Sequence, residues 1–300
     1  MNINISKNNY SRFIGILLTA VMCTVFYNLS MVMPVVGFGL LVYKIKNVSM
    51  TRKTEWILTT LISIIFIGGI NLYISPTTYK FGVEFFSAES LKNLAGYILI
   101  FLPIEILYYV FNIGKIKIPV FDRIIITSMI TTITAFLYIK MLNIDESLLK
   151  AVIAETNNLD KQTVEIIFKF MKENAYYLVY TYIGFITYTT YYYFGKKSYP
   201  RWRISYQWLL LYIIPFFLIR FGHIQNLYLT NMMLMVKISF VVYGTKIVYN
   251  FMKLKIKSSL ICQIMALILC FNFQNITFII AGLLSFEAVR VTIIKNNGGK

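Results

Sequence analysis

Long apolar runs, separated by short clusters of lysine and arginine, dominate this sequence. The runs recur from residue 13 to residue 294, and at about 20 residues each they are long enough to cross a bilayer as helices. Hydrophobic residues occupy 58% of the 300 positions and charged residues 14%, against about 45–50% and about 25% in soluble domains. We therefore expect an all-α fold: a polytopic transmembrane helix bundle of about eight to ten spans, forming a single integral membrane domain over residues 1–300.

Four basic clusters alternate with loops that carry little positive excess. The clusters follow Tyr43, Phe111, Phe194 and Phe251, and two apolar spans separate each from the next. Because cytoplasmic loops of membrane proteins are enriched in Lys and Arg, this alternation places all four clusters and the C-terminus in the cytoplasm. It also accounts for the net charge of +17 without a nucleic-acid partner, and we expect none.

The first apolar run, Phe13 to Tyr43, is too long for one comfortable span, because a continuous helix of that length would measure about 46 Å. Asn28, Ser30 and Pro34 interrupt it, and proline disfavours helix at its own position and at the preceding residue. We expect a broken helix or a hairpin of two closely joined helices. The alternative is a single tilted span after an interfacial turn, so the number of crossings stays open.

The later spans are read directly from the apolar runs. They are expected at 56–74, 93–111, 124–142, 175–194, 206–219, 227–251, 260–273 and 276–294.

Residues 144–172 differ from the rest because acidic residues outnumber basic ones there and the apolar residues form stripes. One stripe is Leu148, Leu149, Val152 and Ile153, and the second is Val164, Ile167, Phe168 and Met171. Both follow helical spacing, and Asp160 is a suitable N-cap for the second helix. This pattern predicts an extracytoplasmic segment of two amphipathic helices at the outer surface.

Two charged residues lie inside expected spans. Glu105 and Lys237 are each about 15–18 Å from the outer end of their span, and a charge in hydrocarbon is usually paired or faces a cavity. Both are candidates for an intramembrane ligand or polar site, and we hypothesise that they form an ion pair. The alternatives are a structural contact between helices or a position near the interface for Glu105, and a snorkelling side chain for Lys237.

The span at 175–194 is unusually rich in tyrosine. Tyrosines at its ends fit interfacial aromatic belts, which is the favoured explanation for the enrichment. Tyr180, Thr181, Thr187 and Tyr188 lie deeper, and aromatic walls with a few polar groups are typical of small-molecule sites. We treat these four residues as candidates for the lining of a pocket for a flat organic ligand.

Signs of catalysis or of cofactor binding are lacking in the sequence. The three cysteines, Cys23, Cys262 and Cys270, all lie within apolar runs, and His223 is the single histidine. No phosphate-binding loop, nucleophile elbow, zinc-binding helix or dinucleotide fingerprint occurs. We expect no metal, no cofactor and no enzymatic activity.

The C-terminal third carries short motifs that resemble a known family. Residues 243–246 (Tyr-Gly-Thr-Lys) lead to a basic turn at 253–255 and a short apolar span, followed by Gly-Leu-Leu-Ser-Phe at 282–286 and by Arg290. These features resemble the YybS-like family of bacterial membrane proteins, a domain of unknown function, although Ser285 stands where that family has an acid. The family is distantly similar to substrate-binding components of energy-coupling-factor vitamin transporters.

The resemblance implies a multi-pass protein of the bacterial cytoplasmic membrane that works with other membrane subunits and binds a small organic ligand. Our first hypothesis is therefore a small-molecule-binding or permease-like transport component. The alternative is a non-transporting membrane scaffold or assembly partner for envelope proteins.

Overall fold

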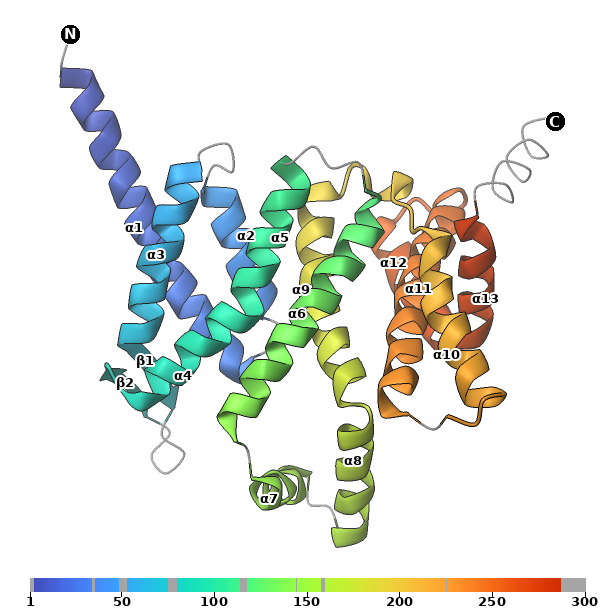
Figure 1. Ribbon diagram of the computed structural model, residues 1–300. Coiled ribbons are helices and arrows are strands. Elements are labelled where there is room, and N and C mark those ends of the chain that lie inside the picture. The colour runs from blue at the N-terminus through green and yellow to red at the C-terminus, as the bar shows by residue number, and fades with distance from the viewer. Residues whose placement is uncertain are drawn as a thin grey trace. The chain divides into compact units, whose positions relative to one another are not determined.

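The computed structural model shows a helical protein with one small sheet (Figure 1). Helices dominate the part of the chain that the structure describes, so the all-α class predicted from the sequence is confirmed, with one β-hairpin that the sequence analysis missed. The described residues are 3–33, 36–48, 53–74, 80–113, 118–143, 145–157, 160–224 and 226–286.

Contacts divide the chain into two compact units. Unit 1 comprises residues 1–116, 127–144 and 185–193, and unit 2 comprises residues 117–126, 145–184 and 194–300. Two long helices, α6 (Val120–Leu142) and α9 (Ala175–Gly195), contribute residues to both units. The prediction of one membrane domain gave no indication of this division.

Unit 1 begins with a long helix and a short one. Helix α1 (Ile3–Val32) packs against both α2 (Gly37–Asn47) and α3 (Lys53–Gly69). The segment predicted to be a broken helix or a hairpin thus holds two separate helices, and Pro34 lies between them, outside the described residues. Helix α2 has 11 residues, and a helix that short measures about 16 Å, roughly half a bilayer core.

A β-hairpin follows α3, where the sequence analysis continued the span to Ile74. Helix α3 ends at Gly69, and β1 (Ile70–Ile74) pairs with β2 (Phe81–Phe85) in an antiparallel register. The predicted span boundary was wrong because the Gly68-Gly69 pair weakens the helix. The hairpin then closes onto the helix end, with the Phe86 amide donating to the Gly69 carbonyl at 2.9 Å.

The next apolar segment is helical throughout but changes its winding. It consists of α4 (Ala88–Gly96), a π-helical turn, η2 (Tyr97–Phe101), and α5 (Leu102–Ile113). Pro103 has no N–H to give to the carbonyl of Leu99 four residues earlier, and the Thr134 hydroxyl of α6 donates to that carbonyl instead, at 2.5 Å.

Unit 2 contains a pair of short helices in the segment predicted to be amphipathic. Helices α7 (Glu146–Asn157) and α8 (Lys161–Glu173) are joined by the ion pairs Lys150–Glu165 at 2.7 Å and Lys172–Glu146 at 2.9 Å. The predicted N-cap of α8 is confirmed, since the Asp160 carboxylate accepts from the amide of Thr163 at 3.1 Å. The side chains of Leu148 and Val152 lie outside the described part.

The remaining helices of unit 2 form a C-terminal group in which α10, α12 and α13 all pack against α11. They are η3 (Tyr199–Arg201), η4 (Tyr206–Leu209), α10 (Leu210–Arg220), α11 (Leu227–Lys253), α12 (Ser259–Asn272) and α13 (Gln274–Ser285).

The last two helices are not the two independent spans expected from the sequence. Their axes turn by 107° across Phe273, and α12 has only 14 residues, a length of about 21 Å that cannot cross a core of about 30 Å. The prediction of a separate span at 260–273 was therefore wrong. The predicted residues 287–294, with Glu287 and Arg290, lie outside the described part.

Four helical stretches of the described chain are long and apolar enough to cross a membrane, or five if the bent α12–α13 pair is one span. These apolar helices indicate membrane association. The four are Ser11–Ser30, Ala88–Asn112, Val120–Leu142 and Leu227–Lys253.

Candidate functional site

Unit 1 contains a buried ion pair. The Nζ atom of Lys44 is 2.5 Å from Oε2 of Glu105, and each side chain is 1% exposed. Lys44 comes from α2, and Glu105 from the first turn of α5. Because charges in apolar surroundings are costly unless they are paired, the partner explains how Glu105 can lie inside an apolar helix.

Helix α2 directs Lys44 inward because the lysine occupies a position on its buried face. Gly37, Leu40, Leu41 and Lys44 are the buried residues of α2, and their spacing of three and four residues defines one side of a helix. An added Cβ at Gly37 would lie 3.1 Å from the ring of Phe101, so the small residue allows a close approach of the two segments.

The π-helical turn brings Tyr97 onto the same side of its segment as Glu105. Eight residues apart in a regular α-helix, the two side chains would differ by about 80° in direction. A π turn inserts one extra residue into the helix, so these eight residues wind only as far as seven residues of a regular α-helix. The difference in direction between the two side chains then falls to about 20°. The Tyr97 hydroxyl can then donate to Oε1 of Glu105, at 2.8 Å.

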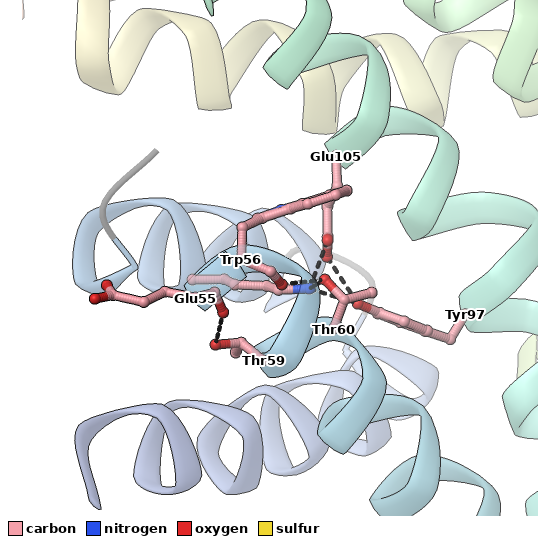
Figure 2. A network of polar contacts seen from close by, with 7 residues as sticks. Glu55, Trp56, Thr59, Thr60, Tyr97 and Glu105 are labelled. Carbon is pink, nitrogen blue, oxygen red and sulfur yellow. Dashed lines mark hydrogen bonds and ion pairs between the residues drawn. The ribbon is translucent and has the colours of Figure 1, made fainter. Parts of the chain in front are cut away.

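Hydrogen bonding within this cluster is complete. The Lys44 ammonium has three N–H donors, and it contacts Glu105 Oε2, the Tyr97 hydroxyl at 2.9 Å and the Thr60 hydroxyl at 2.9 Å. Thr60 in turn donates to the backbone carbonyl of Trp56 at 2.8 Å. Figure 2 shows the side chains of Thr60, Tyr97 and Glu105 directed toward one another, with Thr60 on α3 and the other two on the continuous η2–α5 segment. We call Lys44, Thr60, Tyr97 and Glu105 the charged cluster.

Aromatic rings and a thiol surround the charged cluster. The Lys44 ammonium lies 6.0 Å from the centroid of the Trp56 ring and 5.7 Å from that of Tyr97. The rings of Tyr27 and Tyr97 meet edge to face at 5.6 Å. Cys23 is a buried free thiol that interacts electrostatically with both Lys44 and Glu105. This low-polarity wall strengthens each electrostatic contact inside it.

The hypothesised pair between Glu105 and Lys237 is wrong, because Glu105 pairs with Lys44. From the sequence alone, Lys44 belongs to the first basic cluster and was predicted to be cytoplasmic. Its spacing from Gly37, Leu40 and Leu41 was the signal that could have placed it on a buried face instead. Lys237 lies on α11 in unit 2, half-buried, and has no hydrogen bond or ion pair with any described residue.

The four candidates on α9 belong to different units. Tyr180 is buried in unit 2 and exchanges a hydrogen bond with Ser239 at 2.7 Å, while the exposed Thr181 donates to its own helix at the Tyr177 carbonyl. In unit 1, Thr187 is buried with no hydrogen-bond partner among the described residues, and Tyr188 stacks on Tyr192. A shared ligand pocket lined by all four therefore stays a prediction.

Unit 2 holds a buried carboxylate that the sequence analysis missed. Asp122, at the start of α6, accepts hydrogen bonds from the amide and hydroxyl of Ser205, the former at 2.8 Å, and from the indole N–H of Trp208 at 3.0 Å. These three donors are neutral and come from the connection between α9 and α10. Asp122 thus anchors that connection to α6.

No protein-family model, curated protein or solved structure matches this chain. The chemistry of the site therefore rests on its own geometry. Within the residues that the structure describes, no group of three or more His, Cys, Asp and Glu side chains could hold a metal ion. The charged cluster offers a proton-bearing hydroxyl, a cation and a carboxylate, which are groups that recognise polar or charged small molecules.

Proposed function

We propose that this protein is a multi-pass integral protein of the bacterial cytoplasmic membrane that binds a small organic molecule and acts as a permease-like transport component. The observation that carries this proposal is the fully buried Lys44–Glu105 pair inside an apolar helical unit. Ionisable residues within membrane segments are retained chiefly along substrate and ion pathways.

The membrane placement is supported by helix lengths and by charge. Besides the four apolar helices, α9 has 21 residues and α3 has 17, lengths within or near the usual range for a span. Lys196 and Lys197 follow the end of α9, and Lys253 ends α11. These basic residues at helix ends support a cytoplasmic location for those ends and for the C-terminus.

A transport role explains the charged cluster better than a scaffold role does. A well-packed apolar pair would hold two helices together as firmly as a buried ion pair, and often more firmly. The pair also lies beside a π-helical turn, and such turns occur frequently at functional sites. A ligand that carries one charge can replace one member of the pair, and this exchange gives the unit two arrangements, closed and ligand-bound.

The direct test is a thermal-shift screen of the purified protein against vitamins, nucleobases and amino acids. It is run in parallel on wild type and on the double variant Lys44→Met/Glu105→Leu, which removes both charges together. We expect at least one compound to raise the melting temperature of wild type and not that of the double variant. If no compound stabilises the protein, or if both proteins are stabilised equally, the result would contradict ligand binding at the charged cluster and favour the scaffold hypothesis.

The membrane topology has its own test. Reporter fusions at Lys161, the first residue of α8, and at Lys197, after α9, should report opposite compartments, with Lys197 in the cytoplasm. Reporters that respond from the same compartment would contradict the proposed threading of α9.

A further inference from the structure

An open hollow of about 400 Å³ lies in unit 2 where the bend between α12 and α13 meets α11. Pockets for small molecules usually have volumes of about 300–1,000 Å³. The residues that line this hollow are Lys237, Phe271, Asn272, Phe273, Gln274, Asn275 and Ile276.

The bend between α12 and α13 and the residue Lys237 lie at a similar distance from the end of α11. Helix α12 starts near the end of α11 and runs for about 21 Å before it bends. Lys237 is about 24 Å from the end of α11 at Lys253. In the proposed topology α12 and α13 therefore enter from the cytoplasmic side and turn back near the middle of the membrane, as re-entrant segments do where they line a cavity.

The charge of Lys237 has no partner among the described residues, although α11 is a candidate span. An ammonium group at mid-membrane depth must face a counter-charge or a water-filled cavity. The hollow is the cavity that Lys237 lines. A cation with no partner on the wall of an otherwise uncharged hollow attracts an anion.

The rest of the hollow combines amide groups with apolar walls. Asn272 donates to the carbonyl of Ile268 at 2.8 Å, which leaves its amide oxygen and one N–H for other partners. Helix α13 begins at Gln274 without a side-chain cap, so the N–H groups of its first turn add donors beside the lysine. Phe271, Phe273 and Ile276 supply the apolar wall.

We propose that this hollow is a binding site for a small organic anion, in which Lys237 holds a carboxylate and the aromatic residues hold an apolar body. The site goes beyond the charged cluster, because it lies in the other unit and uses none of the same residues. Its depth rests on the membrane placement proposed above, but binding at the site does not require transport. Because Lys237 is the charged residue of the lining and has no partner among the described residues, the site should recognise a negative charge.

The test uses benzoate as the probe, with benzamide as its neutral counterpart. The full-length protein is held in nanodiscs of phosphatidylcholine, so that no anionic lipid competes for Lys237. Binding is followed by the melting temperature at constant ionic strength. We expect benzoate to stabilise the wild type and benzamide to have no effect, because only benzoate offers a charge to the lysine.

Three variants test whether benzoate binding depends on Lys237. Lys237→Met should weaken benzoate binding at least about tenfold, as expected for the loss of a charge-assisted contact, whereas Lys237→Arg should keep most of it. Lys255→Met removes an exposed lysine just beyond α11 and should leave binding unchanged. Equal effects of benzoate and benzamide, or equal benzoate binding by wild type and Lys237→Met, would overturn the proposal.

A second measurement does not depend on the choice of probe. A thiol placed by Asn275→Cys should react faster with a negatively charged methanethiosulfonate reagent than with a positively charged one of similar size. Lys237→Met should remove that preference. An unchanged preference in the double variant would contradict the assigned role of Lys237, while failure of the reporter fusions would instead contradict the membrane placement.

Discussion

The two units stabilise buried charge in different ways. In unit 1 the carboxylate of Glu105 meets the ammonium of Lys44, and two hydroxyl groups complete the cluster. In unit 2 the carboxylate of Asp122 is held by three neutral donors from Ser205 and Trp208. The difference shows that this protein stabilises one buried carboxylate with a cation and another with neutral donors alone.

This contrast also predicts different responses to mutation. Removing one member of an ion pair leaves the other charge uncompensated, and removing both restores neutrality. Removing a carboxylate that is held by neutral donors leaves N–H and O–H groups without an acceptor. No second mutation of a charged residue can compensate for that loss, because no partner charge is present.

The largest effect is expected for Lys44→Met, which leaves Glu105 buried without its cation. The variant should lose about 3–5 kcal/mol of stability, the usual result of breaking a buried pair. The double variant Lys44→Met/Glu105→Leu should recover most of that loss. Thermal and denaturant unfolding in detergent measure both, and losses that simply add in the double variant would contradict a direct pair.

Asp122→Ala should cost roughly 3 kcal/mol, because each buried donor left without a partner costs about 1–3 kcal/mol and water recovers part of it. Asp122→Asn is the matched control, since it retains the shape and one acceptor oxygen and should lose less. The measurement is the same unfolding assay. Equal losses for Asn and Ala would show that the retained acceptor oxygen does not suffice and that the negative charge itself is needed, which would weaken the contrast between the units.

Tyr97→Phe removes one hydroxyl from the charged cluster and leaves the ion pair in place. The expected loss is about 1.5–3 kcal/mol, typical of a hydrogen bond to a charged group. In the background of Lys44→Met/Glu105→Leu the same change should be nearly neutral, because both charged partners of the hydroxyl are gone. A double-mutant cycle measures this coupling, and equal losses in the two backgrounds would contradict it.

The smallest effect concerns Asp160, a fully exposed carboxylate that caps α8. Hydrogen bonds from Thr163 lower the pKa of Asp160 below its ordinary value. The folded helix therefore favours the ionised form, so the stabilisation is present above the unfolded pKa and is lost as the pH falls through the lowered one. Asp160→Asn keeps a cap without titrating. Circular dichroism should show α8 losing helicity in acid in wild type and less so in the variant.

Patterns local in the sequence could predict much of the fold. The runs at 93–111, 124–142, 175–194 and 227–251 are helical, as their length and apolar character indicated, and Asp160 caps its helix. Features set by neighbouring segments were missed. They include the hairpin after Gly69, the π turn at Tyr97 and the bend at Phe273, each of which depends on contacts or winding that single-residue preferences do not encode.

Of the candidate site, one member could be predicted from the sequence and its partner could not. Glu105 could be identified as an out-of-place charge from its own segment, because any carboxylate in an apolar run needs an explanation. Its partner could not be chosen by depth alone, since Lys44 and Lys237 are both basic residues of apolar helices. Packing of α2 beside the π turn decided the choice.

The order of the residues is enough to show that this chain is helical and apolar, where its basic residues cluster, and that Glu105 needs a partner. These properties follow from hydrophobicity and charge, which each segment carries alone. The folded arrangement of the helices is needed to show that Lys44 is that partner, that Asp122 is held by neutral donors and that Lys237 has no partner among the described residues. Pairing between distant segments depends on which helix faces meet, and no segment contains that information by itself.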